Sequence, residues 1–182
     1  MTRLADITLQ ELDDAQRRVH DAIVAGPRGK VEGPLKVWLN SPELADRAQA
    51  LGAFCRFGSI LPPRLSELAI LITGSHWKAG FEWHVHAPIG IAAGLDPDDV
   101  ELLRQGRAPQ FSKHDESVVY TFVIELLVNR RISDPAFARA HTTLGTRGVV
   151  DLVGILGYYS LISMTIVAFD VPVPDGSDPF HD

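Results

Sequence analysis

The chain has 182 residues, of which 46% are hydrophobic and 22% charged, a composition typical of soluble globular proteins. Its formal charge of −6, from 17 Lys and Arg against 23 Asp and Glu, does not favour nucleic acid or an anionic membrane as a partner. Cys55 is the single cysteine, which excludes an intramolecular disulfide, a CxxC redox pair and a cysteine-rich zinc site within this chain. The N-terminal residues lack the apolar segment of a secretory signal, so we expect a cytoplasmic protein.

Helical periodicity and helix-breaking residues predict two helices in the first third of the chain. The first is expected from Thr8, as its cap, to about Ala25, and a loop rich in glycine and proline follows over residues 26–40. The second begins at Ser41-Pro42, where a cap residue precedes proline at the first helical position. Its apolar stripe is expected to point Cys55 toward the core and consists of Leu44, Ala48, Leu51 and Cys55.

Six further helices are expected, approximately over residues 61–78, 81–93, 97–105, 114–129, 134–145 and 148–169. Nowhere does a period-two alternation between hairpin turns predict a strand. The predicted fold is therefore an all-α bundle of about eight helices in one domain, residues 1–182. We divide it into N-terminal helices and loop (1–60), the helices with the candidate site (61–95), C-terminal helices (96–170) and a tail (171–182).

The segment Leu152–Phe169 carries no formal charge over eighteen residues, the lower limit for a membrane-spanning helix. Acidic residues bracket it and no cluster of Lys and Arg flanks it, which argues against membrane insertion. We expect a helix buried all round, either central or at a subunit interface. Gly154 and Gly157 would allow a second helix to approach closely.

Two predicted helices place ionisable side chains in apolar surroundings. Glu67 lies among leucine and isoleucine residues, where a carboxylate must be paired or have a raised pKa. Glu82 and His86 are four residues apart and therefore share one face of the next helix. Each also has an ordinary structural explanation, because Glu–His pairs at this spacing are frequent on solvated helices and Glu67 could pair with Arg64.

Three segments resemble the carboxymuconolactone decarboxylase family, which includes the alkyl hydroperoxidase D-like proteins: residues 64–71, the motif at 82–86 and the Ala-Ala-Gly-Leu sequence at 92–95. In the hydroperoxidase branch of that family, a glutamate, a CxxC pair and a histidine form a proton relay around a reactive thiol. The resemblance places the glutamate at Glu67 and the histidine at His86. The two cysteine positions are occupied by Ala79 and Glu82.

This substitution argues against dithiol peroxidase chemistry, which needs a thiol of low pKa. A residual peroxidase would require Cys55 to titrate near neutral pH. The resemblance instead implies a cofactor-free, metal-free decarboxylase or related lyase or isomerase, using acid/base chemistry on a small carboxylated or lactone-type compound in the breakdown of aromatic compounds. Under this hypothesis Glu82 or His86 is the general acid or base, and Glu67 orients the imidazole.

Other residues are assigned to the site more broadly. The predicted substrate-binding residues are aromatic or imidazole side chains, namely Trp38, His76, Trp83 and Tyr158. Arg56 or Arg64 could contribute to binding an anion. The resemblance also implies a homo-oligomer, a trimer or hexamer. The alternative is a non-catalytic small-molecule-binding or assembly module of the same fold, and this alternative would gain if Glu67, Glu82 and His86 did not converge on a cavity.

Overall fold

The structure, a computed structural model, describes residues 2–5 and 7–180. Within these residues it contains eight α-helices, one π-helical turn and no strand, which confirms the predicted all-α class. The elements in chain order are α1 (Asp14–Ala25), α2 (Pro34–Trp38), α3 (Pro42–Ala53), the π-helical turn η1 (Phe54–Gly58), α4 (Pro63–Trp77), α5 (Gly80–Ala92), α6 (Pro97–Arg104), α7 (His114–Asn129) and α8 (Asp134–Phe169).

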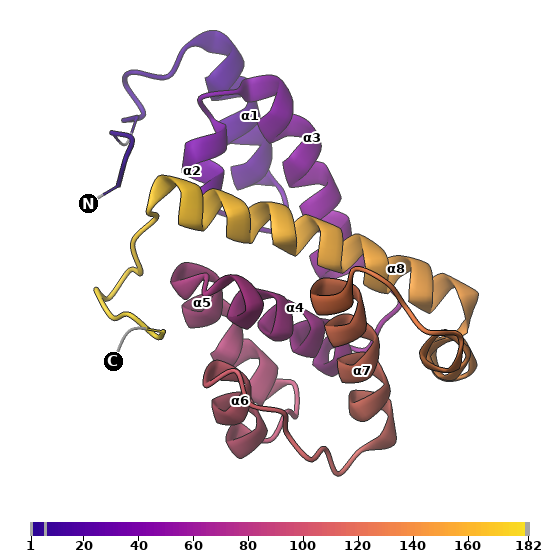
Figure 1. Cartoon of the computed structure of the whole chain (residues 1–182). Helices are drawn as coiled ribbons and strands as arrows, with labels where there is room; N and C mark the ends of the chain where they lie inside the picture. The colour runs from indigo at the N-terminus through magenta and orange to yellow at the C-terminus, as the bar shows by residue number, and fades with distance from the viewer. Residues whose placement is uncertain (1, 6, 181–182) are drawn as a thin grey trace.

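Helix α8 crosses the molecule, with α1, α2 and α3 on one side and α4 to α7 on the other (Figure 1). Helix α4 packs against α5, α6, α7 and α8, so it forms the centre of the bundle. Every residue from Leu65 to Gly74 in α4 is buried, as expected for a helix that is apolar on most sides. This burial also encloses Glu67, the only acidic residue of that segment.

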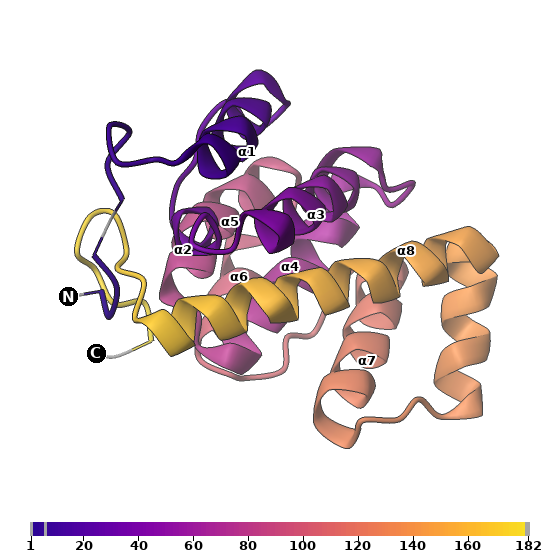
Figure 2. The ribbon, with the colours of Figure 1, turned by 90° about the horizontal axis from the view of Figure 1, so that it is seen from above.

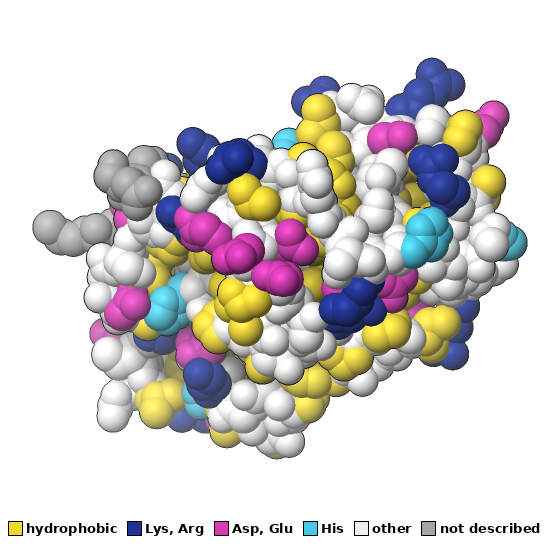
Figure 3. All heavy atoms as spheres, turned by 90° about the horizontal axis from the view of Figure 1, so that it is seen from below, with side chains coloured by type: hydrophobic (Ala, Val, Ile, Leu, Met, Phe, Trp, Pro, Cys, Tyr) yellow, Lys and Arg dark blue, Asp and Glu magenta, His cyan; other side chains and the backbone are white. Residues whose placement is uncertain are grey.

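The two ends of the described chain lie together (Figure 1), and Figure 2 shows the chain turning back from α7 into α8 at the opposite end. The Arg3 amide donates to the carbonyl of Phe169 at 3.0 Å, which attaches the N-terminal segment to the end of α8. On the face shown in Figure 3, acidic side chains gather over α6, whose first turn contains Asp98 and Asp99.

The start of the first helix differs from the prediction. Asp13, and not Thr8, caps α1 by accepting a hydrogen bond from the Gln16 amide, while the Gln16 side chain accepts one from the Asp13 amide. Thr8 instead begins a separate turn, in which its amide and hydroxyl both donate to Glu11. Both segments match the pattern of a cap residue followed three positions later by Glu or Gln, so the sequence offered two starts. The predicted loop over 26–40 also contains the short helix α2.

The apolar stripe predicted for α3 is wrong in part. Leu44 and Leu51 are exposed, whereas Ala45, Ala48 and Gly52 face the core. Cys55 is buried as predicted, but it belongs to η1, where the Ser59 amide donates to the carbonyl of Phe54 five residues earlier. A π-helical turn changes the angular phase of the residues that follow, so an α-helical wheel that includes Cys55 selects the wrong face of α3.

The last two predicted helices form one element, α8, with a break at Gly145, where φ is 70° and ψ is 171°. By length and composition alone, α8 could span a membrane, but half of its most apolar window is buried inside the fold, as in the core helix of a globular bundle. The expectation of burial on all sides is wrong for the single chain. Val150 and Val153 are exposed while Leu152 and Ile155 are fully buried, so the helix has one packed and one open apolar face.

Candidate functional site

The three predicted catalytic residues converge at the contact between α4 and α5. The Nδ1 atom of His86 lies 2.7 Å from Oε2 of Glu67, and its Nε2 atom lies 2.9 Å from Oε1 of Glu82. The exposed fractions of these residues are 6% for Glu67, 4% for Glu82 and 3% for His86. One imidazole ring is therefore held between two buried carboxylates that come from different helices.

Small residues on the facing sides of α4 and α5 allow this arrangement. A Cβ atom at Gly90 of α5 would lie 2.9 Å from Leu95, 3.1 Å from Leu71 and 3.5 Å from the Cβ of Glu67. At Gly74 of α4, a Cβ atom would make only an ordinary van der Waals contact with the side chain of Glu82, at 3.8 Å, so the close approach depends on Gly90. The backbones can thus approach closely enough for His86 to reach both carboxylates.

The electrostatics of the site favour a protonated imidazole. Burial acts against the imidazolium, but the negative charge of Glu82, the hydrogen bond to Glu67, the short contact with Glu82 and the charge of Glu67 together raise the pKa of His86 to about 9. The ring of Tyr159 packs edge-on against His86, with centroids 5.2 Å apart. Burial, followed by the charges of Glu82 and Glu67, raises the pKa of Tyr159 well above its usual value, so this phenol stays neutral.

Glu82 differs from Glu67 in how well its oxygens are satisfied. Its Oε1 atom is close to His86 Nε2, but the contact lacks hydrogen-bond geometry, and the atom is buried with no hydrogen-bond partner among the described residues. The contact is therefore mainly an ion pair. A buried carboxylate oxygen without a hydrogen bond is costly, and such atoms in native proteins call for an explanation.

That explanation lies in a cavity of about 560 Å³ on the side of the ion pair away from Glu67. Glu82, His86, Tyr158 and Tyr159 are among its lining residues, and Glu67 is behind the imidazole and does not line it. The site thus has a layered order, with Glu67 supporting His86, and with His86 and Glu82 facing the space that a small molecule can occupy.

Of the four predicted substrate-binding residues, only Tyr158 lines this cavity. The indole of Trp38 is buried and donates to Thr165 Oγ1 at 2.9 Å, and its ring packs edge-on against Tyr158. The structure places the other two elsewhere. Trp83 packs against Phe180 of the C-terminal segment, and His76 is exposed beside Trp77.

Several cavity residues were not predicted from the sequence, notably Arg28, Phe57 and Tyr159. Arg28 lies in the predicted glycine- and proline-rich loop, where nothing in the pattern distinguishes it from a solvated arginine. Of the two arginines proposed for anion binding, Arg56 lines the cavity. Arg64 does not, because it is engaged by the carboxylates of Asp115 and Glu116.

Cys55 has no part in this cavity. Its exposed fraction is 1%, and burial, with a smaller contribution from the charge of Asp151, raises the pKa of its thiol to about 11. A thiol with this pKa is almost entirely protonated at neutral pH, so it is a weak nucleophile toward peroxide. In the described part of the chain, no three His, Cys, Asp or Glu side chains are arranged to share a metal ion.

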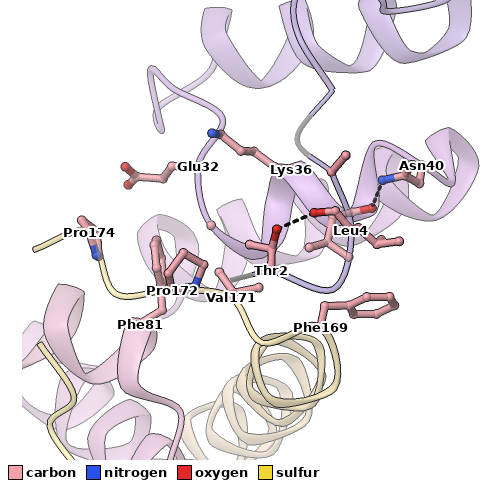
Figure 4. Close-up of a pocket in the computed structure, with 13 residues that line it drawn as sticks. Thr2, Leu4, Glu32, Lys36, Asn40, Phe81, Phe169, Val171, Pro172 and Pro174 are labelled. Carbon is pink, nitrogen blue, oxygen red and sulfur yellow. Dashed lines mark hydrogen bonds between the residues drawn. The ribbon is translucent and has the colours of Figure 1, made fainter. Parts of the chain in front are cut away.

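A second cavity of about 280 Å³ adjoins the first and shares Glu32, Phe81 and Pro174 with it. It lies between the N-terminal segment, α2 and the chain after α8, with Phe81 and Pro172 on its wall (Figure 4). Phe81 fits against Gly33, where any Cβ atom would lie 2.3 Å from the phenyl ring. This second space contains none of the three predicted catalytic residues.

No protein-family model matches the chain, and no curated protein matches it. Among solved structures, it is similar to a crystal structure described as an uncharacterized peroxidase-related protein from Silicibacter sp. TM1040, with a TM-score of 0.76 and 16% sequence identity over 99% of this chain and 96% of that one. At this identity the likeness concerns the fold alone. The chain therefore has the all-α, alkyl hydroperoxidase D-like fold that its motifs led us to expect.

Proposed function

We propose that this protein is an acid/base enzyme, a cofactor-free decarboxylase or closely related lyase that acts on a small carboxylated or lactone-type compound. The observation that carries the proposal is the Glu82 carboxylate. It is buried, has no hydrogen bond to Oε1, and lies on a cavity wall beside a protonated imidazole. A substrate in the cavity can contact the Glu82 carboxylate, and the adjacent His86 supplies a proton.

The geometry supports a separate role for each of the three residues. Glu67 accepts a hydrogen bond from Nδ1 of His86, which fixes the ring and stabilises its charge. In a decarboxylation, the bond between the substrate carbon and its carboxyl group breaks, CO2 leaves, and the electron pair stays on the carbon as an enolate. His86, paired with Glu82, then donates the proton to that carbon and is reprotonated from solvent. In an isomerisation, Glu82 would remove a proton next to a carbonyl group and His86 would return it.

The thiol alternative receives no support from this site. The similar crystal structure is named peroxidase-related, but the only cysteine of this chain is buried, lies outside the cavity and has a raised pKa. The alternative, a non-catalytic small-molecule-binding or assembly module, would gain if Glu67, Glu82 and His86 did not converge on a cavity. The three residues contact one another, and Glu82 and His86 line the cavity, which supports catalysis instead.

Turnover by the Glu82→Gln and His86→Ala variants tests the proposal. Lactones and enol acids would be screened with the wild type for release of CO2 or for isomerisation. Both variants should lower kcat by about 10²- to 10⁴-fold, the usual contribution of a general acid or base, while circular dichroism remains that of the wild type. Glu43→Gln, which removes an exposed carboxylate from α3, is the control and should leave kcat unchanged. Activity like the wild type in both site variants would refute the proposal.

The remaining expectations belong to the same proposal. We propose a homo-oligomer, trimeric or hexameric, in the cytoplasm, with a small molecule as its substrate. The exposed apolar face of α8 supports self-association, because an uncharged hydrophobic helix face of this kind is normally covered in the functional state.

A further inference from the structure

The cavity has an uneven distribution of charge. Two arginines line it, Arg28 from the segment between α1 and α2, and Arg56 from η1. Neither has a carboxylate partner among residues 2–5 and 7–180. By contrast, the third basic residue on the wall, Lys30, forms an ion pair with Glu32 at 2.8 Å. The cavity thus contains two guanidinium groups that form no ion pair within the described part of the chain.

Both guanidinium groups are held by aromatic rings. Nη2 of Arg28 donates to the Tyr158 hydroxyl at 3.0 Å, and the group lies 6.0 Å from the centre of that ring. Arg56 lies over the ring of Phe57, 5.3 Å from its centre. Aromatic contacts leave most guanidinium donors free while they restrict the side chain, which is the state expected of a preorganised anion-binding group.

Two features of the backbone position Arg28 and Arg56 at the cavity. A Cβ atom at Gly52 would lie 2.1 Å from the Tyr158 hydroxyl and 2.4 Å from Nη2 of Arg28, so only glycine leaves room for this pair. The π-helical turn that carries Arg56 departs from regular helix at the point where the chain passes the cavity. Such turns are frequent at functional sites.

The arginines and the acid/base pair lie close enough to act on the same groups. The charges of Arg28, Arg56 and Glu82 all influence the Tyr158 hydroxyl, and those of Arg56, Glu67 and Glu82 influence Tyr159. Tyr158 and Tyr159 are consecutive on α8, in edge-to-face contact at 5.2 Å. The first bonds to Arg28, and the second packs on His86. One small molecule can therefore reach both the cationic and the acid/base parts of the cavity.

We infer that Arg28 and Arg56 form an anchor for a substrate carboxylate, and that this carboxylate is retained in the product. The chemical reason for its retention is charge. Loss of CO2 moves the negative charge of the departing carboxylate onto carbon. Two cations beside that carboxylate would stabilise the substrate, in which the charge has not yet moved, more than the transition state. The two arginines therefore hold a carboxylate that does not react, while the reacting carbon lies next to Glu82 and His86. The inference rests on the proposed function for the reaction, but binding alone tests the anchor.

Calorimetric titration at low salt tests it, with benzoate as the probe, benzamide as its uncharged analogue, and inorganic phosphate as a different anion. The wild type should bind benzoate saturably and bind benzamide at least about tenfold more weakly, because a hydrogen-bonded charge pair contributes a factor of about 10 or more. Arg56→Met, which keeps an apolar side chain of similar length, should weaken benzoate binding by a similar factor. Arg18→Met, on the exposed side of α1, is the matched control and should bind like the wild type.

The Arg28→Lys variant distinguishes a role of Arg28 in binding the carboxylate from a role in positioning the Tyr158 hydroxyl. It keeps the charge but loses the planar fork, so benzoate binding should fall less than in Arg28→Met at an equal thermal midpoint. The inference is overturned if the wild type binds benzamide as tightly as benzoate, if it binds no benzoate, or if both methionine variants bind like the wild type. Phosphate that displaces benzoate and binds more tightly would overturn the carboxylate assignment in favour of a phosphorylated substrate.

Glu82→Gln distinguishes this inference from the proposed function. It removes a negative charge from the cavity wall, so benzoate should bind to this variant at least as tightly as to the wild type, although turnover is lost. Intact turnover in Glu82→Gln, together with weak benzoate binding in Arg56→Met, would refute the acid/base role and leave the anchor standing. Lost turnover in Glu82→Gln, together with benzoate binding like that of the wild type in Arg56→Met, would refute only the anchor.

Discussion

At the scale of single residues, the candidate site depends on how each ionisable group is satisfied. Glu67 and His86 have a well-formed hydrogen bond and would pass as a buried structural pair. Glu82 is less well satisfied, because its Oε1 atom has an ionic contact with His86 but no hydrogen bond among the described residues. Purely structural carboxylates in cores are normally fully bonded, so Glu82 is the residue that most clearly marks a site for a ligand.

The raised pKa of His86 leads to a prediction for stability. In the unfolded chain this imidazole has a pKa near 6.5, whereas in the folded protein it is about 9. Its stabilising contribution is therefore complete below about pH 6.5 and is lost as the pH rises through about 9, and it amounts to roughly 3 kcal/mol at most. Urea denaturation between pH 6 and pH 10 should show this loss in the wild type, while His86→Gln should be less stable at pH 6 and have a flatter profile.

His141→Gln is the control for that experiment, since His141 is exposed and far along the chain from the site. Its pH profile should match that of the wild type. The same loss of stability between about pH 6.5 and 9 in His86→Gln as in the wild type would mean that another group is responsible and that the imidazole is not protonated in the folded state.

At the scale of the elements, close approach between helices positions the site. Gly90 lets α5 approach α4 closely beside the ion pair, and Gly52 lets α3 approach the Arg28–Tyr158 pair beside α8. Local sequence determines where each helix ends. The functional groups of different helices meet because glycine at particular positions lets the helices approach. Glycine lowers helix propensity, so its presence inside α3 calls for a reason of this kind.

Gly52→Ala should therefore destabilise the protein. In a helix without contacts, this change stabilises by about 1 kcal/mol, but here the new methyl group overlaps a buried tyrosine. Overpacking of this kind costs about 1–3 kcal/mol, so we expect a net loss of stability by urea denaturation and weaker benzoate binding. Ala50→Gly, an exposed position on the same helix, measures the propensity alone. A net gain in stability for Gly52→Ala would show that Tyr158 and Arg28 move aside without cost.

At the scale of the whole molecule, α8 packs on the central helix α4 with one face and exposes apolar side chains on another. Val150 is 65% exposed, and the same helix face continues through Val153, Gly157 and Met164 without a charged residue. The opposite face of α8 packs on α4 and carries the two tyrosines of the cavity. The open face and the cavity therefore lie on opposite faces of one helix.

The proposed homo-oligomer is tested by replacing this face with charge. Sedimentation velocity of the wild type should show a trimer or hexamer, and Val150→Glu/Val153→Glu should shift the protein to smaller species, because buried unpaired carboxylates oppose association. Val128→Glu, an exposed valine on α7, is the control and should leave the sedimentation pattern unchanged. A monomeric wild type at tens of micromolar concentration would contradict the proposed oligomer.

The sequence by itself determined the class of the fold and the identity of the three central residues. Helical periodicity and helix-breaking residues are local signals, so α4, α5, α6 and α7 begin and end within two residues of the prediction. The spacing of Glu82 and His86 required no tertiary structure, because an interval of four residues places both on one face of any α-helix. The match to a known motif added Glu67 from another helix.

Only the tertiary structure decided which residues surround that group. Arg28 and Arg56 precede Glu82 by 54 and 26 residues (82 − 28 and 82 − 56). They enter the cavity through a loop and a π-helical turn, whose side-chain directions no regular period predicts. Trp38 and Trp83 had the composition of ligand-binding residues, yet the structure packs them against Thr165 and Phe180. Long-range packing determines which aromatic ring faces a cavity, whereas local sequence determines only that the ring is on a helix.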